Sequence, residues 1–358
     1  SLLPYLPVYY NSMGLDGKRI GGLGAITPTV TFIVSPLWGA LADKTGKHRE
    51  IMLLTFLGSV VARLAMIARP EFWWLVAMVV ASSVLNAPVK PLMDSAVMNQ
   101  LENKADYGRH RLFGQLGFGL ASGLVGPLLA SRGYLAAFGT HAALAVPTAL
   151  VMFNFVPKRA QREAPRFADG LRYVAGSPDI LVFFFVVFLI GLSSGVIENF
   201  AYVRLQEIGG DGTVMGVSRL VSSLAGGPMF WISGWVTQKL GVMGVLTCSL
   251  MSYILRFCIY SLVRNPWHAL PAEFLRGVTF ASFWAASTFY AHSKAPKGLS
   301  ATMLGLLNAC YGGLGQSLGA IVGGQLQQRF GTPGAFLRFA CVEAGFLVFF
   351  LGYCRWGN

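Results

Sequence analysis

The sequence predicts an all-α membrane protein, and three observations support this. Apolar residues make up 54% of the 358-residue chain and charged residues only 12%, whereas a soluble domain carries about 25% charged residues. Glycine occurs 43 times, as is typical of helices that pack closely inside a membrane. Long uncharged runs recur along the chain, and about 20 mostly apolar residues are enough to span a bilayer core.

Charges, glycines and prolines divide the chain into twelve expected transmembrane helices. We expect the first six over residues 1–12, 18–42, 50–68, 72–101, 110–131 and 134–156. We expect the second six over residues 179–205, 213–239, 241–263, 266–292, 298–325 and 332–354. The chain then forms an N-terminal six-helix bundle (1–156), a basic linker on the cytoplasmic side (157–178) and a C-terminal six-helix bundle (179–358). The first helix reaches only about 16 Å, so we expect it to be truncated at its N-terminus.

The placement of charge indicates a membrane rather than nucleic acid. Although the net charge is +13, the basic residues gather in short loops between the apolar runs, which is how membrane proteins set their orientation. By the positive-inside rule the more basic loops lie on the cytoplasmic side of a plasma membrane, or on the equivalent side of an organelle membrane.

The chemistry-bearing residue types show no grouping that is typical of enzymes. The five cysteines have no paired spacing and the five histidines no ligand spacing, so we expect neither a disulfide framework nor a metal site. The sequence also lacks a nucleophile–base arrangement and a phosphate-binding loop. We therefore expect no cofactor and no enzymatic activity.

An internal repeat makes the two bundles pseudo-symmetric. The stretch SPLWGALADKTGKHR ends the second expected helix, and GPMFWISGWVTQKLG ends the eighth. Gly39, Lys44 and Gly46 of the first stretch have equivalents 195 residues further on, at Gly234, Lys239 and Gly241. Repeated halves are typical of transporters, in which the substrate site lies near the bilayer midplane between them.

The first of these stretches resembles the signature loop of the major facilitator superfamily. That signature has a glycine, an acid four residues later, a basic residue, a second glycine and further basic residues. Here they are Gly39, Asp43, Lys44, Gly46, Lys47 and Arg49. The glycines permit a tight turn at a helix end, and Asp43 can cap or pair at a neighbouring helix N-terminus. The second loop departs from the pattern, because Gln238 stands where the first loop has Asp43.

Further stretches resemble the branch that joins lactose-permease-like and nucleoside–proton symporter-like proteins. They are APVKPLMDSAVMNQL, DYGRHRLFGQLGFGL, GVIENFAYVRLQEIGG and LPAEFLRGVTFASFWAA. The last two are especially similar to the eukaryotic transporters named major facilitator superfamily domain-containing protein six. The resemblance implies the major facilitator fold, with twelve helices in two bundles, and uptake driven by a proton gradient.

Ionisable side chains within the expected helices are candidates for function, because they are costly in hydrocarbon. Glu198, Arg219, Arg256 and Glu273 share a depth of about 10 Å below the outer surface, and Arg276 lies one turn deeper. In the functional interpretation Glu273 or Glu198 exchanges the proton, while the arginines at 219 and 276 hold an anionic or hydrogen-bonding solute. In the alternative, ion pairs such as Arg256 with Glu273 only lock the helices together.

The family resemblance favours function for Glu198 and Arg276, because the superfamily lines its cavity with helices one, four, seven and ten. Asn199 adjoins Glu198 and is a further candidate. Trp284 lies two turns below Arg276, where it could stack on a ring or sugar face, or equally well pack against lipid or a neighbouring helix. Arg63 is another of these ionisable candidates, and because it lies near a helix end the alternative for it is that it simply snorkels to the surface.

A second polar group is expected toward the inner side. Asp94, with Arg109 or Arg111, forms a candidate inner gate or a structural ion pair. In lactose-permease-like relatives an acid–arginine pair on these two helices binds sugar. The depths do not match well enough to carry that role over, so we rank a gate or structural pair above direct solute binding.

These features predict a secondary active transporter, with proton-coupled symport of a sugar, nucleoside or organic anion by alternating access. Its partners would be a small solute, protons and membrane lipids, and the chain would act as a monomer or as part of a larger membrane assembly. Two alternatives stay open. One is a non-transporting receptor or structural subunit of a membrane complex, and the other is a uniporter.

Overall fold

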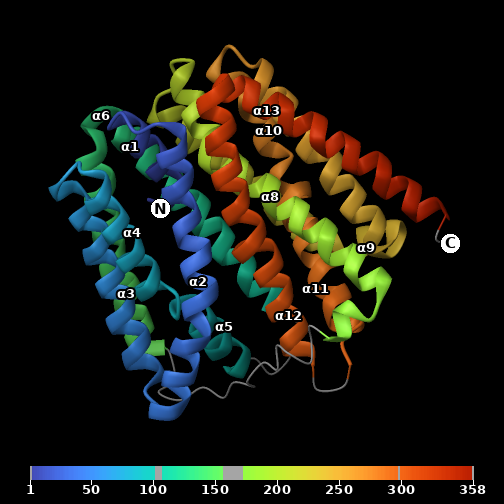
Figure 1. Cartoon of the computed structure of the whole chain (residues 1–358). Coiled ribbons are helices and arrows are strands. Elements are labelled where there is room, and N and C mark those ends of the chain that lie inside the picture. Colours follow the sequence, from blue (N-terminus) through green and yellow to red (C-terminus); the bar gives the residue numbers. More distant parts are fainter. Residues whose placement is uncertain (1, 101–106, 156–171, 297–298, 357–358) are drawn as a thin grey trace.

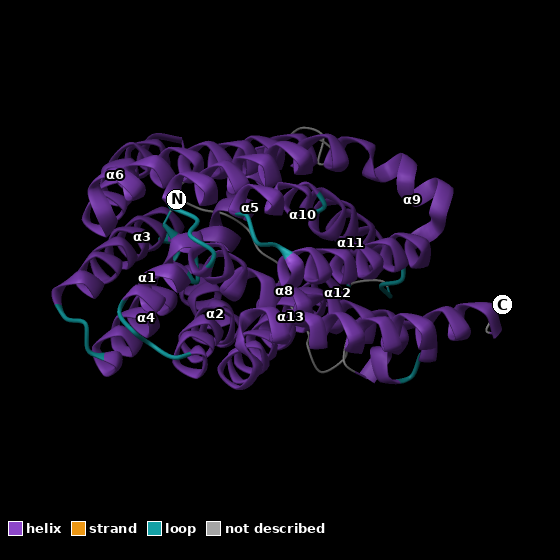
Figure 2. Ribbon diagram, turned by 90° about the horizontal axis from the view of Figure 1, so that it is seen from above, coloured by secondary structure: helices purple, strands orange, loops and turns teal. Residues whose placement is uncertain are grey.

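The computed structural model describes residues 2–100, 107–155, 172–296 and 299–356, and every regular element within these ranges is helical. The helices lie side by side in an elongated bundle (Figure 2). Elements from the first half of the sequence, such as α3 and α4, lie at one side, and α9 and α11 from the second half lie at the other (Figure 1).

The first half of the chain contains helices of very different length. They are η1 (Leu3–Tyr5), α1 (Leu6–Ser12), α2 (Gly17–Thr45), α3 (His48–Leu64), η2 (Ala65–Ala68), α4 (Phe72–Asn86), α5 (Val89–Gln100) and α6 (Tyr107–Phe155). The helix expected over 72–101 is therefore divided. Its break falls at Ala87 and Pro88, because a proline lacks the N–H that a continuous helix needs.

The second half contains two π-helical segments, η5 and η6. Its elements are α8 (Pro178–Glu207), α9 (Gly212–Leu262), η4 (Pro266–Ala269), α10 (Leu270–Phe274), η5 (Gly277–Ser282), α11 (Phe283–Ser293), α12 (Ser300–Asn308), η6 (Ala309–Gln316) and α13 (Ser317–Trp356). The helices expected over 266–292 and 298–325 are thus not uniform α-helices. In both, the hydrogen-bonding pattern changes to the wider π form partway along.

Seven helical segments in the described part of the chain are long and apolar enough to cross a membrane. They are Gly17–Ala42, His48–Ala68, Phe72–Asp94, Phe113–Asn154, Pro178–Glu207, Gly212–Leu262 and Thr302–Gly352. Three of them have 42, 51 and 51 residues, which is about twice the 20 or so residues that one crossing requires.

Each of these three long segments is interrupted by one glycine with the same backbone conformation. Gly133 has φ 72° and ψ −171°, Gly241 has φ 68° and ψ 168°, and Gly331 has φ 69° and ψ 169°. Only glycine adopts this combination readily. At Gly331 the long segment α13 is kinked. Gly133 and Gly331 are 198 residues apart, close to the 195-residue spacing of the internal repeat.

The loop between α2 and α3 has the tight turn that its glycine predicts. Gly46 adopts a left-handed conformation (φ 67°), and its N–H donates to the carbonyl of Ala42 over 2.8 Å. Arg49 at the start of α3 donates to the carbonyl of Phe153 over 3.1 Å and lies over the ring of that residue. The loop is thereby attached to the C-terminal end of α6.

The two halves touch most extensively where α2 packs on α13 and α6 packs on α9. These contacts are closest toward the end of the bundle that holds the turn between α1 and α2, opposite the Gly39–Arg49 loop; we name it the far end. There a Cβ on Gly324 would lie within 3.0 Å of the carbonyl of Gly17, and one on Gly126 within 3.0 Å of the carbonyl of Gly212. Small residues allow this approach of backbones.

Large apolar side chains also cover the outside of the bundle. Leu54, Trp73 and Phe349 are 72%, 77% and 73% exposed. An apolar surface of this extent is unfavourable in water and suits contact with lipid.

Candidate functional site

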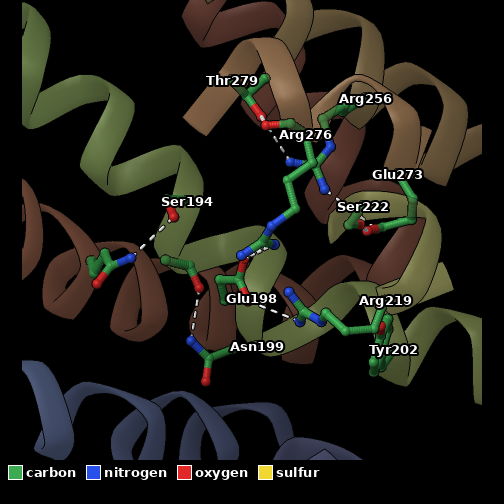
Figure 3. Close-up of polar contacts among 12 residues, drawn as sticks. Ser194, Glu198, Asn199, Tyr202, Arg219, Ser222, Arg256, Glu273, Arg276 and Thr279 are labelled. Carbon is green, nitrogen blue, oxygen red and sulfur yellow. Dashed lines mark hydrogen bonds and ion pairs between the residues drawn. The ribbon is translucent and has the colours of Figure 1, made fainter. Parts of the chain in front are cut away.

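Glu198 forms the centre of a charged group in the second half. It projects from α8 between two arginines (Figure 3). Its Oε2 accepts a hydrogen bond from Nη2 of Arg219 in α9 over 3.2 Å, and its Oε1 accepts one from Nη1 of Arg276, which lies between α10 and η5. The carboxylate thus bridges two cations from different helices.

Arg219 is held in place by more than Glu198. Its guanidinium lies over the ring of Tyr202 at 5.4 Å and the ring of Phe118 at 5.6 Å, distances at which the ring faces attract a cation. The hydroxyl of Tyr202 donates to the carbonyl of Met215 over 2.9 Å, which fixes the ring. Because Phe118 belongs to α6, this arginine links the two halves of the chain.

Arg256 and Glu273 form a second ion pair that is closed to solvent. Nη2 of Arg256 lies 3.3 Å from Oε1 of Glu273, and the two residues are 1% and 2% exposed. Glu273 also accepts hydrogen bonds from the hydroxyls of Ser222 and Tyr260, and Arg256 donates to Thr279 over 3.3 Å. Such full satisfaction of the carboxylate favours the interpretation that this pair fastens α9 to α10.

The two π-helical segments place side chains at the site. Arg276 directly precedes η5, and Gln316 is the last residue of η6. A Cβ on Gly277 would lie within 3.0 Å of the carbonyl of Ala225, so the glycine lets α9 come close beside Arg276. Segments of π-helix are frequent at functional sites, because they shift the side chains that follow.

A cavity of about 290 Å³ lies between the halves and includes the Glu198 group. Polar and aromatic residues of the first half that line it include Tyr10, Thr27, Arg63, Ser82 and Phe118. Polar residues of the second half that line it are Glu198, Asn199, Arg219, Arg276 and Gln316. The cavity is therefore walled by residues that are far apart in the sequence.

Asn199 reaches this cavity because of a glycine opposite it. Its Nδ2 donates to the carbonyl of Gly195 over 2.8 Å. A Cβ on Gly24 of α2 would lie within 3.0 Å of Oδ1 of Asn199, so a larger residue at 24 would require the amide to move.

Comparison with known proteins assigns the family. A family model described as the MFS_1 like family matches residues 1–338. The chain belongs to this family. It is thereby a member of the major facilitator superfamily, as its Gly39–Arg49 loop predicts, and an integral multi-pass membrane protein.

Relatives of this MFS_1-like chain match from about three quarters to nearly all of its length. Maltose permease of Geobacillus stearothermophilus is 26% identical, with 98% of this chain and 90% of the permease covered. The major facilitator superfamily domain-containing protein 6-like of Danio rerio is 24% identical over 77% of this chain and 53% of its own length.

Solved structures show the same fold. The nucleoside transporter NupG aligns with a TM-score of 0.83 at 17% identity, covering 98% of this chain and 94% of that one. The permease and NupG are named as transport proteins rather than as enzymes, in agreement with the sequence analysis.

The structure of the MFS_1-like chain separates the predicted site residues into two sets. Glu198, Asn199, Arg219 and Arg276 line the cavity, whereas Arg256 and Glu273 are not among its described lining residues. Trp284 is also absent from that lining. It is 8% exposed, with its ring 5.5 Å from that of Tyr311 and stacked on Phe280 at 6.2 Å. Of the two interpretations for Trp284, this position favours packing.

The predicted inner gate falls largely outside the described residues. Asp94 is half-buried in α5, but the side chains of Arg109 and Arg111 are not described, so their pairing stays a prediction. The same holds for the side chain of Asp43. Lys44 and Lys47 of the signature loop are exposed.

Arg63 is a cavity residue that the sequence analysis did not place. The alternative that it snorkels to the surface is wrong, because it is 6% exposed and lines the cavity. Its position near the end of α3 suggests an easy route to water. The cost of a charge within an apolar span, which makes Arg63 a candidate in the first place, is the signal that agrees with its position facing the interior of the bundle.

Proposed function

We propose that the chain is a secondary active transporter that carries a small polar solute together with protons by alternating access. The observation that carries this proposal is the cavity between the halves, where Glu198 bridges Arg219 and Arg276. A closed, non-transporting relative would be expected to have a collapsed space there, with all charges paired. The names of the relatives add support, since they include a maltose permease and a nucleoside transporter.

The proposal includes twelve crossings in two six-helix bundles, over residues 1–156 and 179–358. The glycine interruptions support this count, because each of the three longest segments divides into two parts of about one bilayer thickness. Residues 3–12 and 266–293 would supply the remaining two crossings. By the positive-inside rule the Gly39–Arg49 loop would lie on the cytoplasmic side.

Glu198 is the residue that we propose to carry the proton. It reaches the cavity, and its only described side-chain partners are the two arginines. Protonation would remove the charge that attracts Arg219 and Arg276, and would release both guanidinium groups to bind a solute or to move with their helices. Glu273 is less suited, because it is sealed among Arg256, Ser222 and Tyr260.

In the proposed alternating access, the close packing at the far end would form and break as the cavity opens to one side of the membrane and then to the other. The backbones of α2 and α13 and of α6 and α9 approach closely at glycines there, which supports the proposal that this end is the closed one. Opening it would require these backbones to separate, and rocking of one bundle against the other about the cavity would achieve this.

The test is uptake into proteoliposomes with an imposed pH gradient, using panels of sugars, nucleosides and organic acids. We expect the native protein to accumulate at least one solute when protons flow inward. Glu198→Gln should lose accumulation but retain exchange of solute across the membrane, because an amide cannot cycle a proton. Glu71→Gln is the matched control, since Glu71 is exposed just before α4 and outside the cavity.

The outcomes separate the proposal from its alternatives. Uptake that ignores the pH gradient would indicate a uniporter. No uptake of any solute would favour a receptor or a structural subunit. Full accumulation by Glu198→Gln would exclude Glu198 as the proton carrier.

A further inference from the structure

The cavity carries an excess of positive charge. Among its described lining residues, three are arginines (Arg63, Arg219 and Arg276) and one is a carboxylate, Glu198. That carboxylate already bridges the arginines at 219 and 276. The third arginine, Arg63, stands on the opposite wall, in α3 of the first half.

Arg63 is buried without an ionic partner among the described residues. It forms no ion pair with any described carboxylate, and its one side-chain hydrogen bond joins Nη1 to Nε2 of His141 over 3.4 Å. A guanidinium remains charged in proteins, and a buried charge without a counter-charge is costly. An anionic group that enters the cavity would supply the missing counter-charge.

The rest of the lining limits what such an anion looks like. The cavity volume of about 290 Å³ is at the lower end of the range for ligand pockets, roughly 300–1,000 Å³. Met66 and Phe118 provide apolar surface, while Thr27, Ser82 and Gln316 provide neutral polar groups. These features fit a small organic molecule with one charged end.

We propose that the transported solute is a small organic anion and that Arg63 binds its carboxylate or phosphate group. This inference rests on the proposed transport function and names its substrate class. The planar fork of a guanidinium matches both groups, because it can donate two parallel hydrogen bonds. Entry of one negative charge together with one proton on Glu198 leaves the net charge of the cavity unchanged, so the two cargoes compensate each other electrically.

The experiment measures binding and uptake with matched pairs of solutes. Purified protein is heated with small carboxylic acids and with their amides, and with sugar phosphates and the parent sugars. Acids or phosphates that bind should raise the melting temperature of the native protein, and their neutral partners should not. In Arg63→Gln the affinity for the same anion should fall about tenfold to a hundredfold, the usual effect of losing a charged hydrogen bond.

Two further variants keep this test decisive. Arg63→Lys retains the charge but not the fork, so it should bind the anion with intermediate affinity even if Arg63→Gln does not fold. Arg338→Gln is the control, because Arg338 lies over the ring of Phe330 and is not among the cavity-lining residues. It should bind like the native protein.

The outcomes distinguish this inference from the proposed function. If the native protein accumulates neutral solutes and is indifferent to anions, transport stands and the anionic substrate is excluded. If anions bind equally well to the native protein, Arg63→Gln and Arg63→Lys, Arg63 is not the binding residue. If no solute is taken up or bound at all, the transport proposal itself fails.

Discussion

Gly126 of α6 and Gly212 of α9 lie so close that a Cβ on Gly126 would stand within 3.0 Å of the carbonyl oxygen of Gly212. The two residues belong to different halves of the chain, and their contact lies at the far end of the bundle. Nothing but backbone separates the helices there. The stability of this close packing therefore depends on the absence of a side chain.

Adding one methyl group at Gly126 should force the two helices apart. We expect Gly126→Ala to lower the melting temperature of the purified protein by several degrees, since overpacking costs about 1–3 kcal/mol. Gly139→Ala is the control in the part of α6 that follows Gly133, because the Cβ it would add meets no atom of another segment within 4 Å. This control should be neutral or slightly stabilising, as alanine favours a helix. Equal melting temperatures for both variants would show that the far end is not packed this tightly.

The sequence predicts the membrane fold and the depth of the charged residues, because both follow from the order of residues along helices. Apolar runs and the Gly39–Arg49 loop identify the helices and the family. Counting residues from helix ends places Glu198, Arg219 and Glu273 at one depth, and the structure brings the first two of these into contact. Depth alone, however, does not state which face of a helix a residue occupies.

Which residues form the rest of the site depends on how each helix is oriented about its own axis and on contacts between segments that are far apart in the sequence. Glu198 and Glu273 have similar depth, yet only Glu198 is among the residues lining the cavity. The π-helical segments that position Arg276 and Gln316 have no recognisable signal in the sequence. The sequence did not place Arg63 in the cavity for the same reason. Its nearness to a helix end is compatible with a side chain that reaches the surface, and the sequence does not show which face of α3 it occupies.

Breaking the Arg256–Glu273 pair should destabilise the protein without removing proton coupling. In Glu273→Gln the buried guanidinium of Arg256 loses its counter-charge, which costs about 3–5 kcal/mol for a pair of this kind. We expect a clear fall in melting temperature, while the folded fraction still accumulates solute in response to a pH gradient. Glu198→Gln should abolish accumulation, and because it leaves Arg219 and Arg276 without their counter-charge, its melting temperature should fall as well.

A double variant provides the control for this ion pair. Replacing both Arg256 and Glu273 with glutamine leaves no unpaired charge, so the double variant should be more stable than Glu273→Gln alone. If Glu273→Gln melts like the native protein but loses all accumulation, Glu273 is a proton carrier and the structural interpretation of the pair is wrong.

Glu343 of α13 is a buried carboxyl group that the proposed transport mechanism does not use. It is 3% exposed, it accepts a hydrogen bond from the hydroxyl of Ser193 in α8, and its Oε2 has no hydrogen-bond partner among the described residues.

An amide of the same shape can accept the Ser193 hydrogen bond and cannot carry a charge. We therefore expect Glu343→Gln to retain the native melting temperature or to exceed it, because burying a charge without a partner is unfavourable. Ser193→Ala should lower it, since losing a donor to a buried carboxyl group costs about 1–3 kcal/mol. Both variants should keep full accumulation in proteoliposomes, and a loss of accumulation in Glu343→Gln would place a proton site on α13 instead.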